Sequence, residues 1–199
     1  MENIKKIVNF LFELASAKTT ARTGWQRIGI KVPESLADHS ALSGQIAYIL
    51  ALMEGANPDR AAALALFHDA AELRLGDANW VARIYTDHEN RKDKVLNDQL
   101  AGLPMMDGLK KIFNELKDIR TKEAIVALDA DSLDMAIQAR YYFENGNKKA
   151  GLWFEGIKNS FRTDSAKQIY ALLENVGIEE WWMELEGIKN KFESIRGNK

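Results

Sequence analysis

Three ionisable residues stand at the end of an alanine- and leucine-rich run: His68, Asp69 and Glu72 follow the segment 61–66. Burying such groups is unfavourable by several kcal/mol unless they are paired or bind a metal ion. On a helix, Glu72 would share a face with both His68 and Asp69, because it lies four and three residues after them. This spacing predicts that the three side chains meet at a cation site.

A second histidine, His39, lies in the first turns of another apolar segment, 35–54. It argues against the simpler interpretation of His68 and Asp69 as a solvated pair at a helix end. The remaining histidine, His88, lies in a polar run and is expected at the surface. Two imidazoles and one carboxylate form a nitrogen–oxygen ligand set that suits Mn, Fe, Co, Ni, Zn or Mg. His39, His68 and Asp69 are therefore candidate ligands of one divalent metal ion.

A fourth ligand is expected from the segment 128–135, where Asp129, Asp131 and Asp134 interrupt an apolar helix. Asp129 and Asp131 each share a helix face with apolar residues, so periodicity does not choose between them. Asp134 is expected to be the most exposed of the three. The pattern alone therefore leaves the fourth ligand open between Asp129 and Asp131.

The composition limits the class of protein. A chain of 199 residues with 46% hydrophobic and 28% charged residues is typical of one soluble globular domain. The formal net charge of -2, without a long block of one sign, argues against a nucleic-acid partner or a membrane surface. No segment approaches the ~18 uninterrupted apolar residues of a membrane helix. The absence of cysteine excludes disulfides and thiolate ligands, and it fits a reducing cytoplasm.

The elements that must position these residues are helices, because apolar residues recur at three- and four-residue steps along most of the chain. An irregular loop, with a short extended piece at 28–32, is expected over 19–34. The fold class predicted is a single all-α domain. Helices are expected at about 3–17, 35–54, 58–73, 105–118, 121–143, 147–161, 163–175 and 178–195, with a solvated helix within 78–102.

Four blocks of the sequence stand out, in this order: Arg22–Trp25, Pro33–Ser40, His68–Asp77 and Ala130–Met135. Together they resemble the HD-domain metal-dependent phosphohydrolases, and more narrowly their 5'-deoxynucleotidase branch. The resemblance runs from about residue 10 to 154, and it implies one HD-type helical bundle over 1–199, with C-terminal helices at 155–197. It further implies a cytoplasmic enzyme, often a homodimer, that uses one divalent metal ion to release phosphate from deoxyribo- or ribonucleoside 5'-monophosphates.

The resemblance also implies a role for individual residues. The metal ligands it implies are His39, His68, Asp69 and Asp131. Glu72 matches the acid that activates or orients the attacking water, and Asp77 matches an acid that supports catalysis near the substrate. Arg22 and Trp25 match positions that contact the nucleotide, and for Trp25 the alternative is a loop anchor packed on the core.

Two other functions are compatible with the same residues. One is an HD-type hydrolase of another phosphorylated nucleotide, either pyrophosphoryl or 3'-diphosphate. The other is a non-catalytic helical module whose metal site is structural. A structural site tends to be coordinatively closed, whereas a catalytic site keeps a position open for water or substrate.

Overall fold

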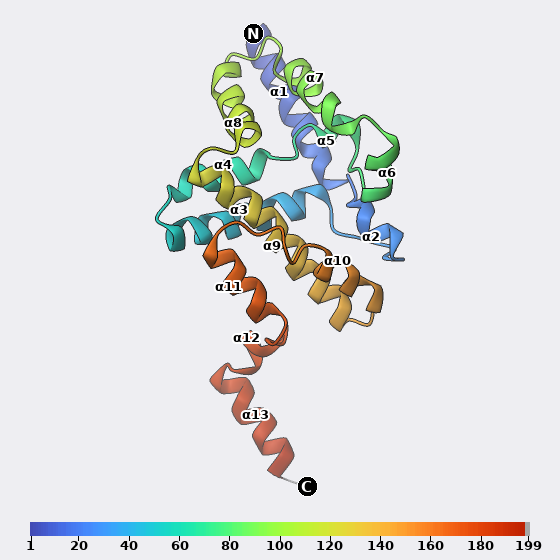
Figure 1. Ribbon diagram of the computed structural model, residues 1–199, viewed down its shortest axis with the longest axis vertical. Helices are drawn as coiled ribbons and strands as arrows, with labels where there is room; N and C mark the ends of the chain where they lie inside the picture. Colours follow the sequence, from blue (N-terminus) through green and yellow to red (C-terminus); the bar gives the residue numbers. More distant parts are fainter. Residues whose placement is uncertain (198–199) are drawn as a thin grey trace.

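The structure is a computed structural model that describes residues 1–197, and its regular elements in that range are all helices (Figure 1). The predicted all-α class is confirmed. An isolated antiparallel bridge joins Ala21 to Ser35. The helices are α1 (Glu2–Ala15), α2 (Thr23–Arg27), α3 (Leu36–Glu54), α4 (Pro58–Phe67), α5 (Glu72–Leu75), α6 (Trp80–Tyr85), α7 (His88–Leu100), α8 (Met106–Asp118), α9 (Lys122–Glu144), α10 (Gly151–Gly156), α11 (Asp164–Leu173), α12 (Glu180–Met183) and α13 (Glu186–Gly197).

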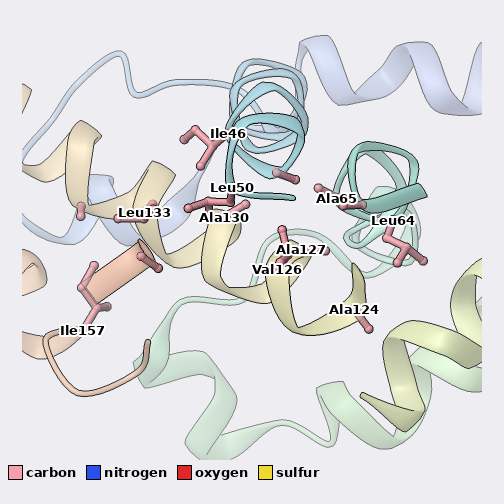
Figure 2. Close-up of a cluster of buried hydrophobic side chains, with 14 of the residues drawn as sticks. Ile46, Leu50, Leu64, Ala65, Ala124, Val126, Ala127, Ala130, Leu133 and Ile157 are labelled. Atoms are coloured by element: carbon pink, nitrogen blue, oxygen red, sulfur yellow. The ribbon is translucent and has the colours of Figure 1, made fainter. Parts of the chain in front are cut away.

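Helix α9 is the centre of the core, where it packs against α3, α4, α10 and α11. Its buried side chains are mostly small, such as Ala127 and Ala130, which lets neighbouring helices approach closely (Figure 2). Larger side chains fill the remaining space: Leu50 of α3, Leu64 of α4 and Leu133 of α9 are fully buried. Each contributes about 1.5–3 kcal/mol through the apolar surface it removes from water.

Local side-chain caps begin the three helices α3, α4 and α9. Ser35 and Asp38 form a reciprocal capping box at the start of α3. Asn57 caps α4, with Pro58 at the first helical position, and Thr121 caps α9. Each cap stabilises its helix by about 0.5–2 kcal/mol. These caps fix where α3, α4 and α9 begin, and all three helices lead to the predicted cation site.

The prediction of one continuous helix over 58–73 is wrong at residues 68–71. Helix α4 ends at Phe67, a turn covers residues 68–71, and the short α5 begins at Glu72. The physical reason is visible at the break, where Nδ1 of His68 donates to the carbonyl of Ala65. The backbone then continues through turns in which an amide donates to the carbonyl three residues earlier. One example is the amide of Glu72, which donates to the carbonyl of Asp69. Glu72 therefore begins a helix separate from the one that precedes His68.

The loop expected over 19–34 contains a short helix, α2, and the extended piece expected at 28–32 is not a strand within the residues that the structure describes. The first turn of α2 is capped from a distant part of the chain. The amide of Thr23 donates to Oδ2 of Asp77 at 2.6 Å, and the Thr23 hydroxyl donates to the same carboxylate and to the Asp77 carbonyl. A long-range partner therefore determines this helix.

The C-terminal helices α11 to α13 extend away from the rest of the molecule (Figure 1). Helix α11 still belongs to the core, because it packs on α9 and buries Ala166 and Tyr170. Helices α12 and α13 pack against each other. Within residues 1–197, no helix is both long and apolar enough to span a membrane.

Candidate metal centre and active-site cavity

Four side-chain atoms converge where α3, α9 and the turn after α4 meet: Nε2 of His39, Nε2 of His68, Oδ2 of Asp69 and Oδ1 of Asp131. The two nitrogens are 3.2 Å apart. Nε2 of His39 lies 3.6 Å from the Asp69 oxygen and 3.2 Å from the Asp131 oxygen. Nε2 of His68 lies 3.1 Å and 3.6 Å from the same two oxygens. The structure thus brings together the four residues expected to bind a metal ion.

These separations fit donors that share one ion. Metal–nitrogen and metal–oxygen bonds of about 2.1 Å place neighbouring donors about 3.0 Å apart in octahedral coordination and about 3.4 Å apart in tetrahedral coordination. The histidine and carboxylate atoms are 3.1–3.6 Å apart. Only small adjustments of these side chains would therefore bring all four atoms onto a single ion.

Hydrogen bonds behind the two imidazoles turn their Nε2 lone pairs toward the cluster. Nδ1 of His68 lies 2.6 Å from the carbonyl oxygen of Ala65, which can only accept. Nδ1 of His39 lies 2.5 Å from a carboxylate oxygen of Asp134, which also accepts. Two imidazole lone pairs and two carboxylate oxygens then face one another, and their mutual repulsion requires a positive charge between them. The donor set therefore fits a dication.

The pKa values of these groups show the same demand for positive charge. Burial opposes protonation of His39, but Asp131 and Asp134 outweigh it and raise the His39 pKa to about 9. Burial is likewise outweighed at His68, whose pKa Asp69 and Asp131 raise well above the ordinary value. Burial opposes ionisation of Asp69 and Asp131, yet the two imidazoles hold the pKa of both carboxyls below the usual range. Protons and a metal ion therefore compete for this site.

Asp129 and Asp131 face different partners, which separates the two candidates that periodicity left open. The Asp129 carboxylate is buried and accepts hydrogen bonds from the amides of Arg162 and Thr163 and from the Thr163 hydroxyl, at 2.7–3.1 Å. It thereby holds the chain between α10 and α11. Asp131 points to the two histidines and is the one of the pair that reaches the cluster.

Asp134 was expected to be exposed, and this is wrong: its side chain is fully buried against His39. Because Asp134 fixes the orientation of the His39 ring, it is part of the site. The sequence analysis did not identify it as a site residue. The signal was present in the spacing, since Asp131 and Asp134 lie three residues apart and so share one face of α9. A carboxylate behind a metal-binding histidine is a common arrangement in metal sites.

Glu72 is fully buried, and its side-chain partners are the cations Arg83 and Lys92. Its Oε1 is 3.4 Å from Nη2 of Arg83 and 3.8 Å from Nζ of Lys92. Within the described part of the chain, Oε2 has no hydrogen-bond partner. Burial, together with the negative charges of Asp69 and Asp77, raises the pKa of Glu72 to about 8. The carboxyl group therefore exchanges a proton near neutral pH.

Arg22 lies beside the cluster, and acidic residues hold it there. Its Nη1 is 3.1 Å from Oδ1 of Asp77 and 3.4 Å from Oδ2 of Asp69. Burial would lower the pKa of this guanidinium, but the surrounding carboxylates outweigh it and keep Arg22 charged. Asp77 is thus bonded to Arg22 and to α2 at the same time, and it positions both.

Trp25 is packed in the core, as the loop-anchor alternative expected, with 2% of its surface exposed. Its Nε1 donates to Glu34 at 2.8 Å, and its ring meets the edge of Tyr142. Burial, with the charge of Asp134, raises the pKa of Glu34 to about 7. Only part of the indole borders the neighbouring cavity.

A cavity of about 120 Å³ opens beside the cluster and is bordered by Asp69 and Asp131. It therefore joins the candidate metal centre to a space where a ligand can enter. Several of its other residues were not identified from the sequence, because no spacing rule relates them to the histidines. The remaining lining residues are Arg22, Gly24, Trp25, Asp77, Ala78, Asn79, Trp80, Arg83, Met135 and Trp153.

His88 was expected at the surface, and this is also wrong. It is the first residue of α7, with 6% of its surface exposed. Nε2 of His88 lies 3.2 Å from the carbonyl oxygen of Gly76, next to Asp77. His88 therefore fixes the turn after α5 and lies outside the metal cluster.

Comparisons with known proteins identify a family. A family model described as "HD domain" matches residues 14–173. A protein of Danio rerio named 5'-deoxynucleotidase HDDC2 is 32% identical over 156 residues, which is 76% of this chain and 76% of that one. A protein of Schizosaccharomyces pombe named 5'-deoxynucleotidase hdd1 is 33% identical over 151 residues, 71% of this chain and 76% of that one.

Solved structures have the same fold. The PH0347 protein of Pyrococcus horikoshii superposes with a TM-score of 0.72 at 26% identity, over 85% of this chain and 98% of that one. A conserved hypothetical protein of Pyrococcus furiosus superposes with a TM-score of 0.74 at 24% identity, over 85% and 99%. The second similarity concerns the fold alone.

Proposed function

The chain belongs to the HD domain family, and from this membership and the geometry of its site we propose that it is a divalent-metal-dependent phosphohydrolase. Its substrates in this proposal are deoxyribo- and ribonucleoside 5'-monophosphates, from which it releases phosphate. The observation that carries the proposal is the convergence of two imidazole nitrogens and two carboxylate oxygens at the wall of a cavity that also contains Arg22. The names of the relatives support the choice of substrate.

One divalent ion would be held by His39, His68, Asp69 and Asp131. When bound, it would lower the pKa of a water molecule and offset negative charge on the phosphoryl group. The nitrogen and oxygen donors suit Mn, Co, Ni, Zn, Fe or Mg, and we propose no single one of them. Arg22 is charged and faces the same cavity, so its guanidinium can bind phosphate oxygens.

We assign Glu72 to proton transfer. Its pKa of about 8 suits a group that accepts and returns a proton near neutral pH, and its unpartnered Oε2 leaves one oxygen available for that task within residues 1–197. Asp77 supports the reaction by holding Arg22 at the cavity, through the 3.1 Å contact. Trp25 supports the wall against which the nucleotide binds.

The proposal is tested by measuring phosphate release with each candidate metal against a panel of nucleotides. We expect metal-dependent release from monophosphates, abolished in His68→Ala. Arg22→Ala should raise KM for these substrates by about tenfold or more, because a charged hydrogen bond to phosphate is lost. Arg27→Ala is the matched control, since Arg27 is an exposed arginine of the same segment.

Two results would contradict the proposal. Release only from pyrophosphoryl or 3'-diphosphate nucleotides would favour another HD-type hydrolase. Tight metal binding without hydrolysis of any nucleotide would favour a non-catalytic module.

We also propose that the protein is a homodimer that acts in the cytoplasm. Exposed apolar side chains on α1 and α3, such as Phe12, Ile49 and Leu52, support a partner surface. The C-terminal helices also contain large aromatic side chains that could lie in the core or at a dimer interface. Phe154 is in the core, whereas Trp181 is 76% exposed. The absence of cysteine supports a reducing compartment. A monomeric mass by light scattering would contradict the dimer.

A further inference from the structure

Four aromatic side chains form a row from the core to the cavity. Tyr142 of α9 meets Trp25 of α2 edge-on, with ring centroids 5.2 Å apart. Trp25 is followed by Trp153 of α10 at 6.0 Å, and Trp153 by Trp80 of α6 at 5.3 Å. The last two rings are nearly parallel, with 5° between their planes. All three separations lie in the range of favourable aromatic pairs.

The last ring of the row is the exposed one. Trp25 has 2% of its surface exposed, whereas Trp80 has 49% exposed. Trp153 stacks on one face of the Trp80 ring, so the exposed surface belongs to the part that Trp153 does not cover. Trp80 also borders the cavity next to Arg22 and Asp77. A large apolar ring is thus left in water at the entrance of a charged cavity.

Two glycines make room for this arrangement. A Cβ atom at Gly156 would lie 3.0 Å from Cη2 of Trp80, and a Cβ atom at Gly24 would lie 3.4 Å from Nε1 of Trp153. A side chain at Gly156 would therefore push Trp80 out of its place. The position of the exposed ring depends on backbone that comes unusually close to it, which distinguishes it from a freely rotating surface tryptophan.

The cavity is too small for a whole nucleotide. Its volume is about 120 Å³, whereas sites that enclose a small-molecule ligand usually measure ~300–1,000 Å³. In the proposed function the phosphate lies near Arg22 and the candidate metal ligands Asp69 and Asp131, which border the cavity. The other end of the substrate then extends to the entrance, where Trp80 is exposed.

We propose that the uncovered face of Trp80 is a stacking site for the nucleobase, so that the substrate adds a fifth ring to the row. This inference rests on the proposed function and specifies how that same site recognises its substrate. Every nucleobase has a π-face, so stacking accepts different bases and distinguishes nucleotides from sugar phosphates that have none. Trp153 is a positioning residue in this arrangement, because it holds the ring on which the base stacks.

The test compares a deoxyribonucleoside 5'-monophosphate with 2-deoxyribose 5-phosphate, which has the same phosphate and sugar but no base. In Trp80→Ala we expect KM for the nucleotide to rise about tenfold or more, with kcat little changed. KM for the base-free substrate should stay as in the wild type. Trp80→Phe should recover most of the nucleotide affinity. Trp181→Ala is the matched control, because Trp181 is an exposed tryptophan of α12, a helix that contributes no residue to the cavity wall.

Equal changes of KM for both substrates in Trp80→Ala, or no change for either, would overturn the stacking site. Hydrolysis of neither substrate by the wild type would instead contradict the proposed function. In that case equilibrium dialysis of the metal-loaded protein with the deoxynucleotide decides the inference. Weaker binding to Trp80→Ala than to the wild type and to Trp181→Ala supports it, and equal binding to all three rejects it.

Discussion

At the scale of single residues, the position of each carboxylate decides what it can do. Asp69 and Asp131 face the histidine nitrogens, and their pKa values are lowered, so both are ready to bind a cation. Asp134 lies behind His39 and orients it. At Glu72, burial and the negative charges of Asp69 and Asp77 outweigh the nearby cations and raise the pKa to about 8. In the proposed function, the same chemical group thus serves as a ligand, an orienting partner or a proton carrier.

The pKa of Glu72 predicts a pH dependence. A raised pKa means that the carboxyl is protonated below about pH 8 and becomes a base only as the pH rises through that value. If Glu72 takes the proton of the attacking water, kcat/KM should rise with pH and level off above the pKa. A dication at Asp69 favours the carboxylate, so it moves this limb of the profile below pH 8.

Glu72→Gln should lower kcat/KM by about 10²–10⁴-fold and remove the rising limb. The matched control is Glu89→Gln, because exposed Glu89 contacts the same two cations, Arg83 and Lys92. Its pH profile should follow that of the wild type. If kcat/KM still rises with pH in Glu72→Gln, another group carries the proton.

At the scale of elements, two opposite sides of α9 carry carboxylates with different partners. One side directs Asp131 to the histidines of α3 and of the turn after α4. The other directs Asp129 to the backbone of Arg162 and Thr163. Two residues along a helix correspond to a rotation of ~200°, so carboxylates at these positions point in nearly opposite directions. One helix can therefore serve the site and the C-terminal segment together.

This division predicts opposite phenotypes for two neighbouring substitutions. Asp131→Asn should raise the metal Kd at least about tenfold, measured by calorimetry, because an anionic donor is lost. Asp129→Asn should change that Kd far less than Asp131→Asn does, and it should destabilise the fold by about 1–3 kcal/mol, because buried amides lose part of their acceptor. Reversed phenotypes would mean that Asp129 is the ligand.

The elements also show what the sequence can predict. The starts of α3 and α4 were predictable, because Ser35 and Asn57 act on amides of the next turn. The end of α4 was not, because apolar periodicity continues past Phe67 and the break depends on the hydrogen bond of His68 to Ala65. The burial of His88 depends on a carbonyl twelve residues away, which no local pattern reveals.

At the scale of the whole molecule, the candidate site and the C-terminal end of the chain differ in how closely they pack against the core. The candidate ligands come from segments that meet in the core around α9. Helices α12 and α13 extend away from it (Figure 1), and several of their side chains, including Trp181 and Phe192, are exposed. The candidate site should therefore be independent of this terminal arm.

Removal of residues 177–199 should leave the metal Kd unchanged and shift Tm by only a few degrees. Removal of residues 162–199 should instead lower Tm by about 10 °C or more, because it removes the partners of Asp129 and the core residue Tyr170. Calorimetry of both truncated proteins checks this. Loss of metal binding in the shorter deletion would show that the arm supports the site.

The opposed carboxylates of α9 also predict a coupling between the candidate metal centre and the segment 162–163, although Asp131 and Asp129 contact different partners. A roll of the helix about its axis that drew Asp131 away from the histidines would pull Asp129 from the amides of Arg162 and Thr163. An ion that holds Asp131 in place would oppose this rotation, and it would therefore also keep Asp129 in place. If this coupling exists, we expect a bound ion to slow hydrogen exchange at those two amides and, by thermodynamic reciprocity, a firmly held 162–163 segment to strengthen ion binding.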